Sequence, residues 1–295
     1  MRGVNGIHHI TSIAGPETYH LFYADADGHP GSDLTFFPWA QMAPSRPGHG
    51  LAMEVGLEVP QDTLGYWNER LQRYGTQVAP PDTRFGEKVL AFTDPHGLKV
   101  ALTEAPAGRP FTPWEGSPVP SEHQIRGLHG AQLWERDASV TARFLTDILG
   151  FLQLGTENGW TRYGFKGSAG VVDVRDRPDA RRGGWGVGSV HHLAWRVDDE
   201  AHQAAARARV EAAGAHPTPV IDRFWFKSVY FKEPGGVLFE LATDGPGFTA
   251  DEPAETLGER LALPPFLEDR RAQIEPRLTP LPDAAALWRG ASATA

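Results

Sequence analysis

Cysteine is absent from this 295-residue sequence. Its absence excludes disulfides, thiolate catalysis, and zinc or iron–sulfur sites with cysteine ligands. The sequence also has no apolar run of roughly 18 residues, so we expect no membrane-spanning helix. The segment after Met1 lacks the apolar core of a signal peptide, which favours a cytoplasmic protein.

Long basic runs are missing as well. The formal net charge is -9 and the isoelectric point is near 5.7. This balance argues against nucleic acid or a membrane surface as a partner, and it leaves a homo-oligomer open. Glycine and proline are plentiful instead, with 33 and 25 residues, which predicts many short strands joined by turns.

The sequence repeats one pattern of a strand, a helix and further strands. Two copies contain helix-like stretches at 63–74 and 200–213, and a third has one around 138–149. Each stretch ends at a glycine, which is typical of a left-handed C-terminal cap. Repeated patterns of this kind indicate one structural unit used several times.

The first copy along the chain should begin at Ile7, but its start differs from that of the other three copies. Residues 13–15 run directly into 16–19, and strand-like runs follow near 19–24 and 32–37. No helix-like stretch separates them. We therefore expect that this first unit has lost its helix and a strand.

These patterns divide the chain into segments. A Pro- and Gly-rich linker separates the two halves, and the tail contains helix-like pieces at 252–261 and 265–277. The predicted division is a truncated first unit at 1–48, a second unit at 49–105, the linker at 106–126, a third unit at 127–176, a fourth unit at 188–245 and a helical tail at 246–295.

Two histidine pairs occur in similar strand-like runs, His8-His9 in the first unit and His191-His192 in the fourth. The third unit keeps only the first histidine of the pair, as His129. Because neighbouring strand residues point to opposite faces, only one histidine of each pair is expected to face a metal ion. We take the variable positions, His9 and His192, as the metal-ligand candidates and the shared position as structural.

Glu240 follows a Gly-Gly turn and lies among apolar residues, where the second unit has Ala101. A carboxylate in such a run is costly unless it is paired. With His9 and His192 it gives two imidazoles and one carboxylate, which leave open positions on iron(II) for O₂ and a substrate oxygen. The simpler alternative is a pair of hydrogen-bonded core histidines and a solvated glutamate.

Three further residues are candidates for catalysis. Tyr230 could hydrogen-bond an oxygen ligand or be a core aromatic, and His191 could shuttle protons. Arg223 could hold an anionic substrate, but Arg84 occupies the same repeat position, so a turn salt bridge is an equal alternative. We assign no chemistry to the histidines in turn-like segments, which include His20, His49, His123 and His216.

Taken together, these segments resemble the ring-cleaving dioxygenases of the vicinal oxygen chelate superfamily, in particular the hydroquinone and chlorohydroquinone 1,2-dioxygenases. The resemblance covers nearly the whole chain. The segments that carry it include IHHIT at 7–11, YHLFYAD at 19–25, GSDLTFFPW at 31–39, TRFG at 83–86, residues 114–122, VHHL at 190–193, the run 230–240 with EPGG at 233–236, and residues 247–252.

The resemblance implies an α+β fold in which paired βαβββ units form two barrel-like domains. It implies iron(II), with manganese(II) as the other metal, held by His9, His192 and Glu240. It also implies catalytic duties for His191, Tyr230 and Arg223. The implied reaction uses O₂ to break the ring bond next to a hydroxyl of a small aromatic substrate.

Two other functions remain open. One is a small-molecule-binding protein on the same scaffold, catalytically impaired by the shortened first unit. The other is a glyoxalase-type metal-dependent isomerase or transferase, which would not require O₂.

Overall fold

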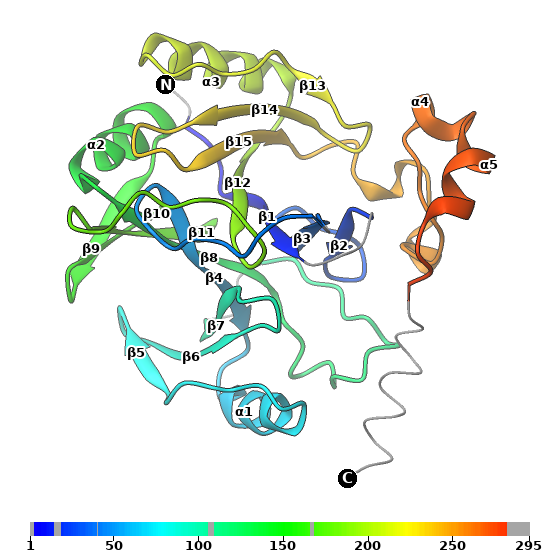
Figure 1. The fold of residues 1–295 in the computed structure, drawn as a ribbon, viewed down its shortest axis with the longest axis horizontal. Coiled ribbons are helices and arrows are strands. Elements are labelled where there is room, and N and C mark those ends of the chain that lie inside the picture. Colours follow the sequence, from blue (N-terminus) through cyan, green and yellow to red (C-terminus); the bar gives the residue numbers. More distant parts are fainter. Residues whose placement is uncertain (1–2, 15–18, 40, 106–108, 166–167, 282–295) are drawn as a thin grey trace.

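The computed structural model describes residues 3–14, 19–39, 41–105, 109–165 and 168–281. Their strands form two sheets, and helices cover the outer faces (Figure 1). The strands of the seven-stranded sheet are β1 (Ile7–Ala14), β2 (Leu21–Tyr23), β3 (Asp33–Pro38), β12 (Val190–Val197), β13 (Ile221–Asp222), β14 (Lys227–Lys232) and β15 (Leu238–Thr243). Their order in the sheet is β13-β14-β15-β12-β1-β3-β2.

The second sheet has eight strands in the order β5-β6-β7-β4-β8-β11-β10-β9. They are β4 (Leu51–Val59), β5 (Asp82–Arg84), β6 (Glu87–Thr93), β7 (Lys99–Glu104), β8 (Gly127–Glu135), β9 (Leu152–Glu157), β10 (Trp160–Phe165) and β11 (Ser168–Asp176). Strand β9 has no counterpart among the runs expected from the sequence.

Each sheet joins one unit from each half of the chain. β1 of the first unit pairs with β12 of the fourth, and β4 of the second unit pairs with β8 of the third, both antiparallel. The linker therefore separates the halves in sequence but not in space. This arrangement confirms the predicted fold of paired units that form two barrel-like domains, while the exact segment boundaries stay a prediction.

Three helices belong to the units: α1 (Leu64–Arg73), α2 (Ala138–Arg143) and α3 (Glu200–Ala212). α2 continues into a π-helix, η1 (Phe144–Leu149), which ends at Gly150 with φ +82°. This left-handed residue is the stop that the sequence predicted. At the N-terminus of α3, the Asp199 side chain accepts a hydrogen bond from the backbone of His202.

The first unit is shortened as expected. In the described part of the chain it has three strands and no helix, whereas the third unit has four strands and a helix. β1 nevertheless lies inside its sheet, with His9 opposite Ala194 on one neighbouring strand and Asp33 on the other. The position of His9 is therefore fixed from both sides without the missing helix.

Apolar side chains from both sheets form one core. On β12 and β15 the buried residues Trp195 and Phe239 contact each other, with ring centroids 5.5 Å apart. Because side chains alternate along a strand, residues between these apolar positions face the opposite, concave side of the sheet. Glu240 follows Phe239 and thus faces the concave side.

The tail differs from its prediction. The piece expected as a helix at 252–261 has only the short 3₁₀ turn η3 (Ala254–Thr256), because Pro253 precedes it and Gly258 takes φ +79°. The remaining elements are η2 (Phe248–Ala250), α4 (Pro265–Glu268), α5 (Arg271–Ile274) and η4 (Glu275–Arg277).

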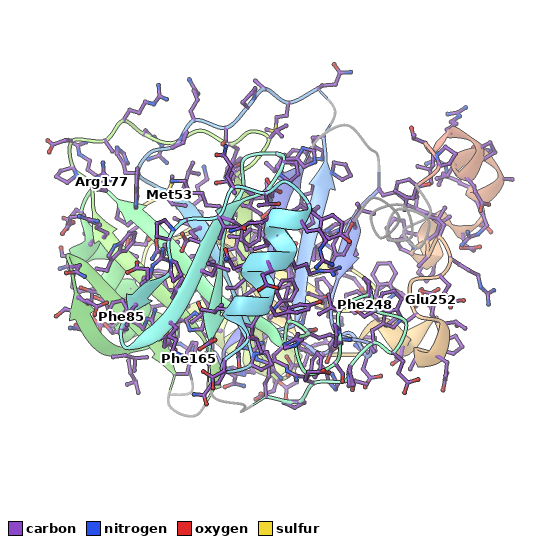
Figure 2. The ribbon with its side chains drawn as sticks, turned by 90° about the horizontal axis from the view of Figure 1, so that it is seen from below. Met53, Phe85, Phe165, Arg177, Phe248 and Glu252 are labelled. Atoms are coloured by element: carbon purple, nitrogen blue, oxygen red, sulfur yellow. The ribbon has the colours of Figure 1, made fainter. Side chains whose placement is uncertain are left out.

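Residues 282–295 of the predicted tail lie outside the described residues. The described part leaves the seven-stranded sheet near Phe248 and Glu252 (Figure 2). Phe248 packs on Phe22, Trp225 and Phe226. This aromatic contact attaches the start of the tail to the concave side of the sheet.

Candidate metal centre

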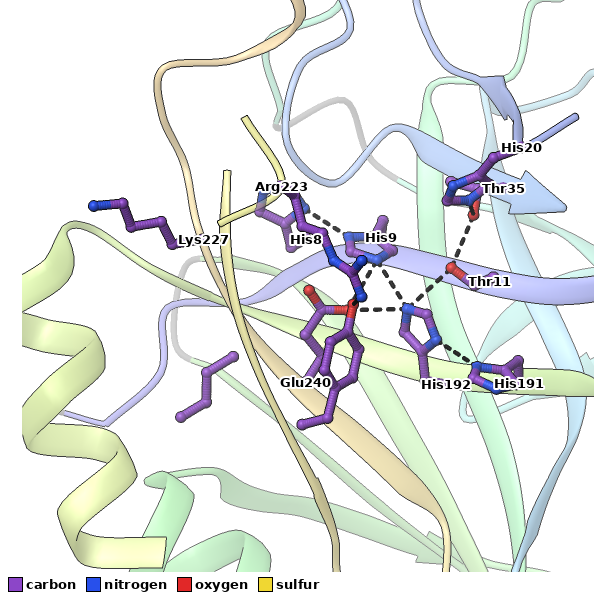
Figure 3. Close-up of polar contacts among 12 residues, drawn as sticks. His8, His9, Thr11, His20, Thr35, His191, His192, Arg223, Lys227 and Glu240 are labelled. Atoms are coloured by element: carbon purple, nitrogen blue, oxygen red, sulfur yellow. Dashed lines mark hydrogen bonds and ion pairs between the residues drawn. The ribbon is translucent and has the colours of Figure 1, made fainter. Parts of the chain in front are cut away.

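Three buried side chains converge on the concave face of the seven-stranded sheet (Figure 3). The Nε2 atoms of His9 and His192 lie 3.0 Å apart. The Oε2 atom of Glu240 lies 3.2 Å from the first and 2.9 Å from the second. Among the described residues this is the one group of three or more histidine and acidic side chains with ligand atoms close enough for one metal ion.

The three residues come from strands that are adjacent in space but distant in sequence. The Glu240 carboxylate is fully buried, and its described polar neighbours are the two imidazole nitrogens near Oε2. A buried anion is costly unless it is paired, and a cation between it and two imidazole nitrogens removes that cost. The donor set therefore fits a metal ion.

The charge on Glu240 depends on its neighbours. Burial alone would raise its pKa, but His9 and His192 hold the pKa of Glu240 well below its ordinary value. Burial lowers the pKa of His192, which favours the neutral ring that a metal requires. At neutral pH the site thus presents the Glu240 carboxylate beside a neutral His192 ring.

The sequence prediction that each histidine pair points to opposite faces is wrong. The Nδ1 atoms of His8 and His9 lie 2.9 Å apart, and those of His191 and His192 lie 2.8 Å apart. The cause is a bulge at the first histidine of each pair, where the register of β1 against β12 shifts. An extra residue in a strand re-aims its neighbours.

These contacts orient the candidate ligands. With Nδ1 of His9 held by His8 and Nδ1 of His192 held by His191, each Nε2 faces the space beside Glu240. His8 is itself fixed, since its Nε2 lies 3.1 Å from the Thr243 carbonyl oxygen. Hydrogen bonds to the second ring nitrogen set the tautomer and orientation of metal-binding histidines in general.

The other predicted residues lie beside this group. Tyr230 is opposite Glu240 on the adjacent strand and packs edge-on against the ring of His192 at 5.3 Å. Arg223 lies over the tyrosine ring and donates a hydrogen bond to its hydroxyl at 3.3 Å. Burial, and then the charge of Glu240, raise the pKa of Tyr230, so its hydroxyl stays protonated.

His191 lies beside this group in an aromatic environment. Its ring stacks on Trp185 at 4.7 Å and meets Phe37 and Trp39 edge-on at 5.4 Å. Burial, followed by the charge on His192, lowers the pKa of His191 to about 4. The side chain is therefore neutral near pH 7.

The eight-stranded sheet has ion pairs at the corresponding place. Glu54 occupies the position of His192 in the repeat, and it pairs with Arg84, the repeat equivalent of Arg223. Gly130 stands where the first unit has His9, and a Cβ there would lie only 2.1 Å from the Val171 carbonyl oxygen. A second histidine ligand cannot be accommodated in that strand, which explains why the group is built once.

Three residues of the site were not found from the sequence. Thr11 Oγ1 lies 3.0 Å from Nε2 of His192 and 2.8 Å from Oγ1 of Thr35, which lies 3.0 Å from Nε2 of His20. His20 has no predicted role, because it stands in a turn-like segment of the sequence. The structure brings His20 close because β2 pairs with β3, while Thr11 and Thr35 meet through the pairing of β1 with β3.

Comparisons with known proteins show which family the chain resembles. The sequence profile of the Glyoxalase/Bleomycin resistance protein/Dioxygenase superfamily matches residues 127–241. A Bacillus subtilis protein named as a ring-cleaving dioxygenase, MhqO, is 37% identical over 93% of this chain and 96% of its own length. The chlorohydroquinone/hydroquinone 1,2-dioxygenase of Sphingobium indicum is 35% identical over 87% of this chain and 82% of its own length.

Solved structures show the same fold. A crystal structure of a protein described as a dioxygenase from Bacillus subtilis superposes with a TM-score of 0.90 and 35% identity, covering 96% of this chain and 99% of that one. Glyoxalase I from Zea mays shares the fold alone, with a TM-score of 0.59 and 13% identity over 81% of this chain and 92% of that one.

In the described ranges no helix combines the length and apolar character needed to cross a membrane. The named relatives support a dioxygenase function, and the buried histidines and carboxylate form a group that could hold a metal ion. The chain belongs to the Glyoxalase/Bleomycin resistance protein/Dioxygenase superfamily, also called the vicinal oxygen chelate superfamily.

Proposed function

We propose that this protein is an iron(II)-dependent dioxygenase that opens a hydroquinone-like phenolic ring with O₂. His9, His192 and Glu240 are the proposed ligands, and manganese(II) is the second metal that the set would accept. The observation that carries the proposal is the approach of two imidazole nitrogens and one buried carboxylate oxygen within 3.2 Å of one another.

The ligand types support iron. Two histidines and one carboxylate leave open positions on iron(II), and they include no soft sulfur ligand that would favour copper(I). When bound, iron(II) supplies a template that holds a phenol oxygen and O₂ beside each other. The hydroquinone-like substrate class is proposed from the name of the Sphingobium relative.

The neighbouring side chains have proposed roles of their own. The Tyr230 hydroxyl is protonated and can donate a hydrogen bond to an oxygen of the bound substrate. Arg223 lies against Tyr230 and adds positive charge for an oxygen that becomes negative. His191 is neutral and contacts the proposed ligand His192, and it can accept a proton from a phenol hydroxyl.

The aromatic environment supports a ring-shaped ligand. Phe37, Trp39 and Trp185 surround His191, and Phe226 packs against His9 with ring centroids 5.3 Å apart. Such flat apolar surfaces suit an aromatic substrate more than a polar aliphatic one.

The function is tested by O₂ uptake with hydroquinone on iron-loaded protein. We expect one O₂ per ring, both atoms of labelled O₂ in the ring-opened product, and loss of uptake in Glu240→Ala. Glu69→Ala, at an exposed glutamate of α1, is the matched control and should keep full uptake. Binding of hydroquinone without uptake would favour the impaired binding protein, and turnover with nickel or zinc without O₂ would favour the glyoxalase-type enzyme.

Two further expectations stay predictions. They are the formation of a homo-oligomer and a cytoplasmic location. Size-exclusion chromatography with light scattering and fractionation of the native host would address them.

A further inference from the structure

A row of hydrogen-bonding groups leads away from the candidate metal centre. It starts at Nε2 of His192, passes through the hydroxyls of Thr11 and Thr35, and ends at Nε2 of His20, with separations of 3.0, 2.8 and 3.0 Å. Figure 3 shows this row on the opposite side of His192 from Glu240 and Arg223. Both threonines are fully buried, whereas His20 reaches the exposed rim.

The row is held in place by its surroundings. Thr11 and Thr35 are directly opposite each other on β1 and β3, so their hydroxyls meet through the strand register. The ring of His20 lies between Phe22 and Phe37, with centroids 4.1 and 4.4 Å away. Packing thus fixes the ring nitrogen that faces Thr35.

Metal binding would remove one of the two hydrogen-bond partners of Thr11. Nε2 of His192 has a single bonding position in the ring plane, and a metal ion would occupy it. The Thr11 hydroxyl would then keep Thr35 as its one described partner and have a second hydrogen-bonding position unfilled in a buried place. An unfilled hydrogen-bonding position on a buried polar group costs free energy. A polar atom of a molecule bound beside the ion is the nearest replacement.

We propose that His20 is a positioning residue, which through Thr35 orients the Thr11 hydroxyl toward the oxygen of a phenol bound at the metal centre. This inference rests on the proposed function for the identity of the phenol. The tautomer of His20 sets the direction of the hydrogen bonds along the row. If Nε2 of His20 accepts, each threonine hydroxyl donates toward His20, and Thr11 offers a lone pair to a phenol hydroxyl. If Nε2 of His20 donates, the hydrogen bonds run the other way and Thr11 offers its proton to a phenolate.

The test uses one matched pair of variants at the middle of the row. Thr35→Val keeps the shape and removes the hydroxyl, whereas Thr35→Ser keeps the hydroxyl. His20→Phe and His20→Gln form a second pair, in which glutamine retains a hydrogen-bonding group. None of these side chains contacts a proposed ligand directly, so the affinity for iron should stay within about twofold in all four variants.

Two readouts are needed. The first is anaerobic titration of the iron(II)-loaded protein with hydroquinone, in which Thr35→Val and His20→Phe should weaken binding by roughly tenfold, the loss of about one hydrogen bond. Thr35→Ser and His20→Gln should bind nearly as well as the wild type. The second is imidazole ¹⁵N NMR of the zinc-loaded protein, which should show one fixed neutral tautomer of His20 in the wild type and in Thr35→Ser, and tautomer exchange in Thr35→Val.

The outcomes separate this inference from the proposed function. If the wild type binds hydroquinone and Thr35→Val binds it equally well, the positioning role is wrong. If His20 exchanges tautomers in the wild type, the row does not have a fixed direction and the inference also fails. If the wild type fixes the His20 tautomer but binds no hydroquinone, the row is supported and the proposed function falls.

Discussion

The Nδ1 atoms of His8 and His9 lie 2.9 Å apart, although the two residues are neighbours on one strand. A bulge in β1 brings both rings to the same side of the sheet, and His8 is anchored in turn on the Thr243 carbonyl. His8 thereby holds the candidate ligand by the ring nitrogen that the metal does not use.

Replacement of His8 by phenylalanine should therefore weaken metal binding without removing a ligand. We expect the affinity for iron(II) to fall by about 10- to 100-fold, the usual effect of losing such an outer hydrogen bond. Competition with a chelator of known affinity measures this. His129 occupies the equivalent bulge of the other sheet and pairs with Glu87, so His129→Phe should leave the affinity for iron unchanged.

Tyr230→Phe should retain the metal and lose turnover. The hydroxyl lies beside Arg223 and is protonated, so its removal deletes a hydrogen-bond donor and leaves the ring packing on His192. We expect kcat for O₂ uptake to fall by about 100-fold, within the range for loss of an acid–base group. Tyr74→Phe, at an exposed tyrosine, is the control; equal kcat in the two variants would show that Tyr230 is only a packing residue.

Gly130→Ala should destabilise the fold. A Cβ at this position would lie 2.1 Å from the Val171 carbonyl oxygen of the adjacent strand, so the strands would have to separate. We expect a loss of about 1–3 kcal/mol in the free energy of unfolding, measured in urea. Gly65→Ala is the matched control, because no atom lies within 4 Å of its Cβ and the residue is in α1. It should raise stability by about 0.5–1 kcal/mol.

Glu135 should make stability depend on pH. Its carboxyl is fully buried next to Glu233, whose own oxygens accept hydrogen bonds from Gly235, Val237 and Thr141. Burial, and then the charge of Glu233, raise the pKa of Glu135 to about 9. Between pH 4.5 and about 9 the folded protein thus keeps Glu135 protonated, whereas the same residue ionises in the unfolded chain. The unfolded state therefore becomes more stable relative to the folded state as pH rises.

The sign follows from linkage. Below the ordinary pKa of 4.5, Glu135 does not lower the free energy of unfolding. As pH rises from there toward about 9, the free energy of unfolding falls progressively. Glu135→Gln should therefore become more stable than the wild type as pH rises from 5 to 8, by up to about 1.4 kcal/mol per pH unit. Urea unfolding at several pH values measures this, with the exposed Glu255→Gln as control; parallel curves for Glu135→Gln and wild type would contradict the prediction.

The sequence predicted much of this site because the repeats acted as internal controls. His9, His192 and Glu240 were chosen since other units have different residues there, and the structure brings those three side chains together. The helices and their glycine stops were predictable for a local reason, since Gly150 takes the left-handed conformation that other residues disfavour.

The remaining features depend on long-range geometry. No local sequence pattern predicts the bulge that turns His8 toward His9, because the bulge arises from the register between two strands that are distant in sequence. His20 enters the site only because β2 folds back on β3 beside β1. The pairing of first and fourth units is likewise a property of the assembled sheets. The helix expected at 252–261 does not form, because Pro253 and Gly258 interrupt its pattern.

The central claim is that His9, His192 and Glu240 hold one ion. A crystal structure of the iron-loaded protein, with anomalous data collected at the iron edge, tests it most directly. We predict a single iron peak per chain within about 2.0–2.3 Å of both Nε2 atoms and the Glu240 carboxylate, by analogy with first-row metal distances. An iron peak elsewhere, or an empty site at saturating iron with all three side chains intact, would contradict the account.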